Sequence, residues 1–139
     1  MLLLDTHAWI WIVDGDARRV GRRARALVAK AAARDALRIS AVSLFEIVAL
    51  HVAGRLRFDR PVERWMDEAL ALAAVRIAGV AREVAVDAGF IPFDALADPV
   101  DRIVAATARH LGATLITADE AVLAYAERTG NVRAHDLRR

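Results

Sequence analysis

Four acidic residues stand where an apolar run gives way to a helical pattern, and they are Asp5, Glu46, Asp101 and Asp119. If the apolar runs are parallel strands, their carboxyl ends line one crevice, where residues far apart in the sequence meet. Gathered carboxylates repel one another unless a divalent cation holds them, and Mg²⁺ and Mn²⁺ favour oxygen ligands. The four acids therefore predict a metal site that hydrolyses its substrate with an activated water and needs no protein nucleophile.

Each acid also has a structural explanation, because helix N-termini attract acidic side chains for electrostatic reasons. Ser43 and Glu46 have the spacing of a capping box, in which the glutamate reaches back to the N-cap amide. Thr117 and Glu120 have a similar spacing at the last helix. Taken singly, capping outweighs catalysis at each position, so the case for a metal rests on the set.

Asp5 and Asp98 show the two explanations side by side. Asp5 ends an apolar strand, where an unpaired buried carboxylate is costly, and its neighbour Thr6 is the better simple cap. Asp98 is followed by Pro99, which predicts a helix with Asp98 as its N-cap and Asp101 in its first turn.

The elements that must position these acids alternate along the chain. Strands are expected at 2–4, 37–41, 75–77, 114–117 and 132–134, and helices at 6–13, 21–34, 43–53, 61–72, 82–88, 98–112 and 120–128. This alternation predicts an α/β fold, a three-layer α/β/α sandwich around a central parallel sheet of four to five strands. No repeat, linker or low-complexity tail interrupts it, so a single domain over 1–139 is expected.

Composition limits the class of protein. Charged residues interrupt every long apolar stretch although 57% of the chain is hydrophobic, so no membrane span is expected. Asp5 follows the first leucines at once, which leaves no signal peptide and makes the cytoplasm the expected location. With no cysteine, the chain has no disulfide, thiolate zinc site or thiol nucleophile.

The basic residues are almost all arginine, Lys30 being the only lysine, and the formal net charge is +2. Arginine suits phosphate because its planar fork binds oxygens bidentately. The arginines indicate either the codon usage of a GC-rich genome or a surface selected for nucleic acid, and both explanations stay open. If a metal neutralises the clustered acids, the remaining surface favours a polyanionic partner.

Other side chains give weaker signals. The histidines show no metal-ligand spacing, and both they and the tryptophans are expected to be structural: His7, His51, His110, His135, Trp9, Trp11 and Trp65. No phosphate-binding glycine pattern is present, so neither a nucleoside triphosphate nor NAD is expected.

Four segments carry a resemblance to a known family. They are LLLDTHAWIW at the start, SAVSLFEIVAL at 40–50, DPVDRIVAATA at 98–108 and LITADEAV at 115–122. Together they resemble a PIN-domain ribonuclease and, within that family, a VapC-type toxin of a bacterial toxin–antitoxin pair. The similarity covers nearly the whole chain, with the motifs in the family's order.

The resemblance implies an endoribonuclease that cuts RNA with Mg²⁺ or Mn²⁺, forms a homodimer and is held inactive by a cognate antitoxin. By motif, the catalytic and metal-binding residues are Asp5, Glu46, Asp101 and Asp119, and the supporting residues are Thr6, Asp98, Arg102 and Thr117. Either Asp98 or Asp101 could be the third of the family's four acids. The motif fits Asp101 better. The helical pair at 43–72 is where such antitoxins dock, although core packing also explains its apolar faces.

Other functions share some of these features. A PIN-like module that binds RNA or protein without cutting would have the same fold. A phosphatase of the haloacid-dehalogenase type needs a second acid two residues after Asp5, where His7 stands, and a phosphoreceiver domain needs a late lysine, whereas Lys30 is early.

Overall fold

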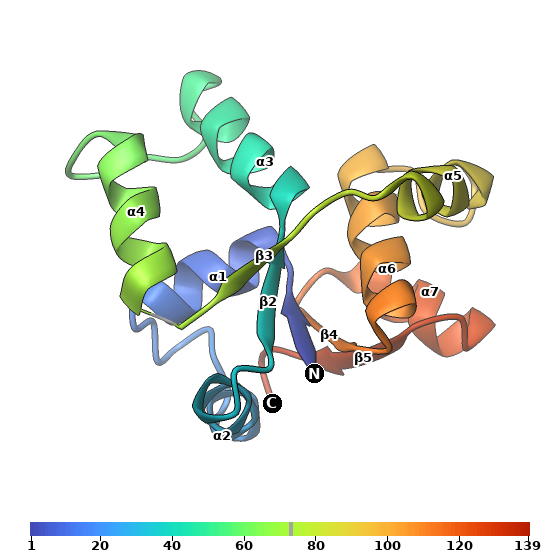
Figure 1. The fold of residues 1–139 in the computed structure, drawn as a ribbon, viewed down its shortest axis with the longest axis horizontal. Helices are drawn as coiled ribbons and strands as arrows, with labels where there is room; N and C mark the ends of the chain where they lie inside the picture. The colour runs from blue at the N-terminus through green and yellow to red at the C-terminus, as the bar shows by residue number, and fades with distance from the viewer. Residues whose placement is uncertain (73) are drawn as a thin grey trace.

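A five-stranded parallel sheet forms the centre of the computed structural model, which describes residues 1–72 and 74–139 (Figure 1). Its strands are β1 (Leu2–Leu4), β2 (Leu37–Ser40), β3 (Arg76–Ala78), β4 (Thr114–Thr117) and β5 (Arg133–Asp136). Their order is β3-β2-β1-β4-β5, and every neighbouring pair is parallel. The expected parallel sheet is confirmed, with the larger of the two expected strand numbers.

Helices cover both faces of this sheet. They are α1 (Thr6–Val13), α2 (Arg22–Ala33), α3 (Ala41–Val52), α4 (Val62–Leu72), α5 (Arg82–Phe90), α6 (Pro99–Leu111) and α7 (Glu120–Thr129). In Figure 1, α1, α2 and α4 lie on one side, α6 and α7 lie on the other, and α5 lies beside α6. The predicted three-layer α/β/α sandwich is confirmed. None of the helices in the described residues is long and apolar enough to cross a bilayer.

The central strand β1 divides its side chains between the two layers because successive residues of a strand point to opposite faces. Leu2 and Leu4 belong to the core under α1, α2 and α4, whereas Leu3 belongs to the core under α6 and α7. Trp9 and Trp65 fill the first core, with ring centroids 5.4 Å apart in an edge contact. Their expected structural role is confirmed.

Helix α3 begins earlier than expected. Ser40, the last residue of β2, is its N-cap and accepts a hydrogen bond from the Val42 N–H at 3.2 Å. Ser43 is fully buried inside the helix and accepts a hydrogen bond from the Thr6 hydroxyl at 3.0 Å. The capping box between Ser43 and Glu46 is therefore wrong, because the serine at the strand end lies closer to the free amides.

Other element ends shift by one or two residues. Strand β3 begins at Arg76, which pairs with Arg38, and β5 continues to Asp136, which pairs with Thr117. Helix α5 continues to Phe90 instead of ending at Ala88. The ends of a short edge strand depend on where its partner strand offers hydrogen bonds. The sequence around the edge strand itself does not reveal these positions.

The last residues of the chain pack against the start of α2. The Gly21 N–H donates to the Leu137 carbonyl at 2.8 Å, and the Ala24 N–H donates to the Arg139 carbonyl at 2.9 Å. Gly21 is the N-cap of α2 and supplies no side-chain oxygen, so the Arg139 carbonyl satisfies an amide that the helix itself leaves free.

Candidate active site

Asp5 is held at the carboxyl end of β1 by two hydrogen bonds. One carboxylate oxygen accepts from the Ala8 N–H at 2.8 Å, which makes Asp5 the N-cap of α1. The other oxygen accepts from the Thr117 hydroxyl. The expectation that Thr6 is the cap is wrong, because Thr6 is buried in the first turn and its hydroxyl donates to Ser43.

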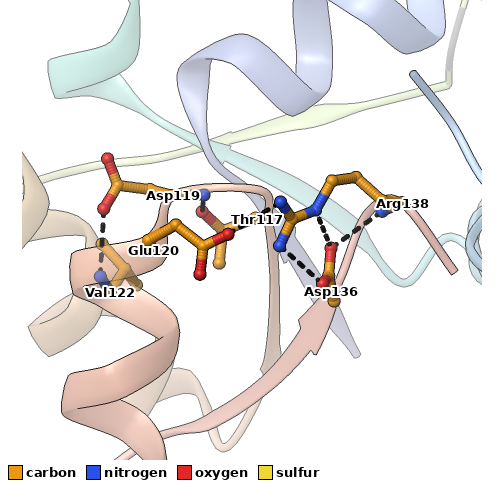
Figure 2. A network of polar contacts seen from close by, with 6 residues as sticks. All are labelled: Thr117, Asp119, Glu120, Val122, Asp136 and Arg138. Carbon is orange, nitrogen blue, oxygen red and sulfur yellow. Dashed lines mark hydrogen bonds and ion pairs between the residues drawn. The ribbon is translucent and has the colours of Figure 1, made fainter.

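Thr117 links Asp5 to Asp119 at the end of β4. Its fully buried hydroxyl donates to Asp5 and accepts from the Asp119 N–H at 3.0 Å. Asp119 in turn caps α7 by accepting from the Val122 N–H at 3.0 Å (Figure 2). The predicted capping pair of Thr117 and Glu120 is therefore wrong.

Glu120 pairs with the C-terminal segment instead. Its carboxylate lies 2.7 Å from Arg138, whose guanidinium also bonds Asp136 at 2.9 and 2.8 Å (Figure 2). These bonds from Arg138 hold the pKa of Asp136 below its ordinary value. The network ties the end of β5 to the first turn of α7, where Asp119 stands.

Asp98 and Asp101 stand together at the start of α6. Asp98 accepts from the Val100 N–H at 2.8 Å and from the Asp101 N–H at 3.4 Å, so its predicted role as N-cap is confirmed. Asp98 is exposed and Asp101 is half-buried. The cap uses one oxygen of Asp98, and both side chains face the same cavity.

That cavity, of about 350 Å³, collects the predicted acids. Asp5, Glu46 and Asp119 follow β1, β2 and β4, whereas Asp101 lies in α6, which follows α5 and a loop. The expectation that an apolar strand leads into Asp101 is therefore wrong. Its carboxylates belong to Asp5, Glu46, Asp98, Asp101 and Asp119. A larger cavity of about 620 Å³ lies beside α7 and β5, but its walls carry arginines as well as acids. The concentration of carboxylates, and not the volume, distinguishes the smaller cavity as the candidate site.

The surroundings of this cavity disfavour the charged forms of two of its acids, Asp5 and Asp101. Burial raises the pKa of Asp5 to about 6, against the opposing hydrogen bonds from Thr117 and Ala8. Burial also raises the pKa of Asp101 to about 7, and repulsion from the neighbouring carboxylates adds to it. Over residues 1–72 and 74–139, no three histidine or carboxylate side chains lie close enough together to hold one metal ion, so the metal stays a prediction.

Arg102 lies apart from the acid cavity. It lines a hollow of about 200 Å³ with Ala85, Ala88 and Gly89 of α5. Successive residues of a helix are turned by about 100°, so the residue after Asp101 faces another neighbour. The structure therefore brings Thr6, Asp98 and the four acids to one cavity, places Thr117 in contact with Asp5, and leaves Arg102 outside.

His7 and Trp11 also line the acid cavity, which the sequence did not lead us to expect. Their rings lie 5.7 Å apart, centroid to centroid. The signal that could have found them is their spacing of four residues, which places both side chains on one face of α1.

Comparisons with known proteins agree with this geometry. The PIN domain family model matches residues 2–128. Ribonuclease VapC22 of Mycobacterium tuberculosis is 33% identical over 119 residues, which cover 85% of this chain and 86% of that protein.

Two solved structures share the fold. One is VapBC2 from Rickettsia felis bound to a DNA fragment from their promoter, with a TM-score of 0.68, 14% identity and 97% of each chain covered. The other is DNA-bound VapBC from Salmonella typhimurium, with a TM-score of 0.67, 18% identity, and 98% of this chain and 97% of that chain covered. The parallel sheet, the gathered carboxylates and the family match lead to one conclusion: the chain belongs to the PIN domain family and, within it, is a relative of VapC.

Proposed function

We propose that this protein is a metal-dependent endoribonuclease that acts as the toxin of a type II toxin–antitoxin module. The observation that carries the proposal is the cavity in which Asp5, Glu46, Asp101 and Asp119 meet. The similarity to a protein named as a ribonuclease supports RNA as the substrate.

The donor set fits Mg²⁺ or Mn²⁺. It consists of oxygen ligands alone, and burial together with repulsion from the neighbouring carboxylates raises the pKa of Asp101, a charge imbalance that a cation would relieve. Asp5, Glu46, Asp101 and Asp119, which line the same cavity, would hold the metal. When bound, the metal supplies Lewis acidity and an activated water for attack on the phosphodiester.

The protein's own residues prepare the site for this reaction. The Ala8 N–H and the Thr117 hydroxyl each hold one oxygen of Asp5, and the Val122 N–H fixes Asp119. Such preorganisation avoids the cost of ordering the carboxylates at the moment of reaction. Asp101, with a pKa of about 7, holds a proton part of the time at neutral pH and must release it when a cation binds.

The partners follow from the same proposal. The resemblance implies a cognate antitoxin and a homodimer. The exposed apolar side chains of α3, Phe45, Val48 and Val52, lie within the predicted docking region at 43–72 and support that site for the antitoxin. The alternative, a catalytically silent PIN-like module, would keep the fold and these surfaces but not the cleavage.

The test is cleavage of total RNA by the purified chain with Mg²⁺, Mn²⁺ or EDTA, with the new ends mapped by sequencing. We expect metal-dependent cuts that disappear in Asp101→Asn. The matched control is Asp94→Asn, which removes an exposed acid outside the cavity and should cut like the wild type.

Two outcomes would count against the proposal. If no condition gives metal-dependent cleavage, the binding module becomes the better description. If Asp101→Asn cuts as fast as the wild type, the carboxylate cavity is not the reaction centre. Growth arrest on expression, relieved by the product of an adjacent gene, would test the toxin role separately.

A further inference from the structure

The indole of Trp11 connects the acid cavity to a second cavity. Trp11 is half-buried in α1 and lines the acid cavity together with His7. It also lines a cavity of about 220 Å³ between the end of α1 and α2. Within the described residues it is the one side chain that the two cavities share, so the two cavities lie next to each other at this ring.

The second cavity suits one flat, apolar ring. Its walls are mainly apolar and include Ile12, Val20 and Val28. The charged side chains that line it are Arg25 and Asp16, and Asp16 pairs with Arg19. The volume lies below the roughly 300 Å³ at which pockets for drug-sized ligands begin, so a single planar group is the appropriate occupant. Unpaired nucleobases bind proteins by stacking on such aromatic side chains.

Positive charge surrounds this cavity. Between residues 17 and 34 the chain has basic but no acidic residues, and five exposed arginines stand at its start: Arg18, Arg19, Arg22, Arg23 and Arg25. We call residues 18–25 the basic segment. The guanidinium of Arg19 lies 4.8 Å from the Trp11 ring centroid and pairs with Asp16 at 3.3 Å.

The other four arginines form no ion pair with a carboxylate of the described residues. Their charge is therefore available for phosphate groups, which arginine binds well.

The basic segment also comes near the first turn of α7. Arg23 lines the cavity of about 620 Å³ together with Glu120, the residue that follows Asp119. Figure 1 shows α2 beside the C-terminal end of the chain, in keeping with the bond from the Ala24 N–H to the Arg139 carbonyl. Cationic side chains of this segment therefore lie near α1 and near α7, two of the helices that contribute to the acid cavity.

We propose that a single strand of RNA leaves the acid cavity across Trp11, places one base in the cavity between α1 and α2, and lays the adjoining phosphates on the basic segment. The base stacks on the indole of Trp11, and Arg25, one of the four arginines without a carboxylate partner, contacts a phosphate. The identity of the polyanion rests on the proposed function. Trp11 thereby positions the strand and decides which nucleotide lies beside the cut.

The test measures binding without cleavage. A short fluorescein-labelled oligouridine is titrated with the full chain in EDTA, and Kd is read from anisotropy. Trp11→Leu should weaken binding about 5- to 100-fold, as expected for the loss of one stacked base, and Trp11→Phe should retain most of the affinity. Arg25→Gln should weaken binding and reduce the dependence of log Kd on log salt by about one phosphate contact.

Matched controls keep the test independent of folding. Phe90→Leu and Arg82→Gln change an exposed aromatic and an exposed arginine of α5 and should leave Kd unchanged. A strand of the same length built from abasic ribose phosphates should bind the wild type and Trp11→Leu equally, because it has no base to stack.

Each outcome separates this inference from the proposed function. Equal Kd for wild type and Trp11→Leu on oligouridine, or no RNA binding at all, would overturn the base site. A change in oligomeric state in place of RNA affinity would assign the cavity to a contact between copies of the chain and overturn it too. Trp11-dependent binding without metal-dependent cleavage would support the base site while the nuclease proposal fails.

Discussion

The hydroxyl of Thr117, at the end of β4, donates a hydrogen bond to the carboxylate of Asp5, at the end of β1. Two neighbouring strands are thus joined at the point where the acid cavity begins. The bond favours the charged form of Asp5 and opposes the effect of burial on its pKa. Thr117 therefore supports the ionised carboxylate that a metal would need.

Replacing Thr117 by valine removes this bond without changing the volume of a fully buried side chain. We expect the free energy of unfolding at pH 8 to fall by about 1 to 3 kcal/mol, as for other hydrogen bonds to charged groups. The loss should be smaller at pH 5, where Asp5 is largely protonated, and Thr117→Ser should restore stability. Urea denaturation at the two pH values measures this, and an equal loss at both would contradict it.

The raised pKa values predict how the metal-free protein responds to pH. An unfolded aspartate ionises near 3.8, whereas Asp101 ionises at about 7 and Asp5 at about 6. Between these values the folded chain binds more protons, so the contribution of these groups to stability is present below about pH 4 and is lost as pH rises to about 7.

Asp101→Asn should therefore stabilise the metal-free protein at pH 8. We expect a gain of roughly 1 to 3 kcal/mol, reduced from the full shift because the side chain is partly exposed to water. The gain should vanish near pH 4. Asp94→Asn, in an exposed loop, should show no such pH dependence, and a gain that is the same at both pH values would contradict the assignment.

Metal should stabilise the wild type more at pH 8 than at pH 5. A cation that binds the folded state alone adds about 2.7 kcal/mol when its concentration is 100 times Kd. At pH 5 protons compete for Asp5 and Asp101, so the rise in Tm with Mn²⁺ should shrink. Differential scanning fluorimetry measures the rise in Tm with Mn²⁺ at each pH. A rise in Tm that is larger at pH 5 than at pH 8 would exclude these carboxylates as ligands.

Asp98 and Asp101 should separate into two roles. Asp98→Ala should cost roughly 0.5 to 2 kcal/mol of stability through the lost cap, with metal binding largely kept. Asp101→Ala should weaken metal binding instead. Calorimetric titration with Mn²⁺ alongside chemical denaturation distinguishes them, and the opposite pattern would make Asp98 the ligand.

Gly21 should not tolerate a side chain. A Cβ at this position would lie 2.2 Å from the Arg139 carbonyl oxygen and 2.6 Å from the Arg138 carbonyl carbon, so the backbone itself would have to shift. Gly21→Ala should cost about 1 to 3 kcal/mol by overpacking and should expose the last residues to proteolysis. Gly89→Ala, where the added carbon meets nothing within 4 Å, should be neutral or stabilising.

The sequence predicted the sheet because its signals are local: the apolar runs at Leu2–Leu4 and Thr114–Thr117 need no knowledge of their partners. The misplaced cap at Ser43 had a different cause. A serine three residues before a glutamate satisfies the capping pattern wherever the helix starts, and the turn was decided by Ser40 at the strand end.

The site was predicted in part for the same reason. Asp5, Glu46 and Asp119 are recognisable because they follow strands of a parallel sheet, whose carboxyl ends converge. Asp101 follows no strand, and only its motif at the start of α6 identified it. Arg102 and Trp11 could not be placed this way, because their surroundings depend on which helix packs beside them: α5 lies next to Arg102, and α2 borders the cavity beyond Trp11.

The order of the strands gives this protein a built-in delay during its own synthesis. Strand β1 is synthesised first but lies in the middle of the sheet. One of its edges stays unpaired until β4 has been synthesised. At roughly 5 to 20 residues per second, the ribosome needs on the order of ten seconds between Asp5 and Asp119. Until then the acid cavity lacks one wall, so a nascent or prematurely terminated chain has no complete carboxylate cavity.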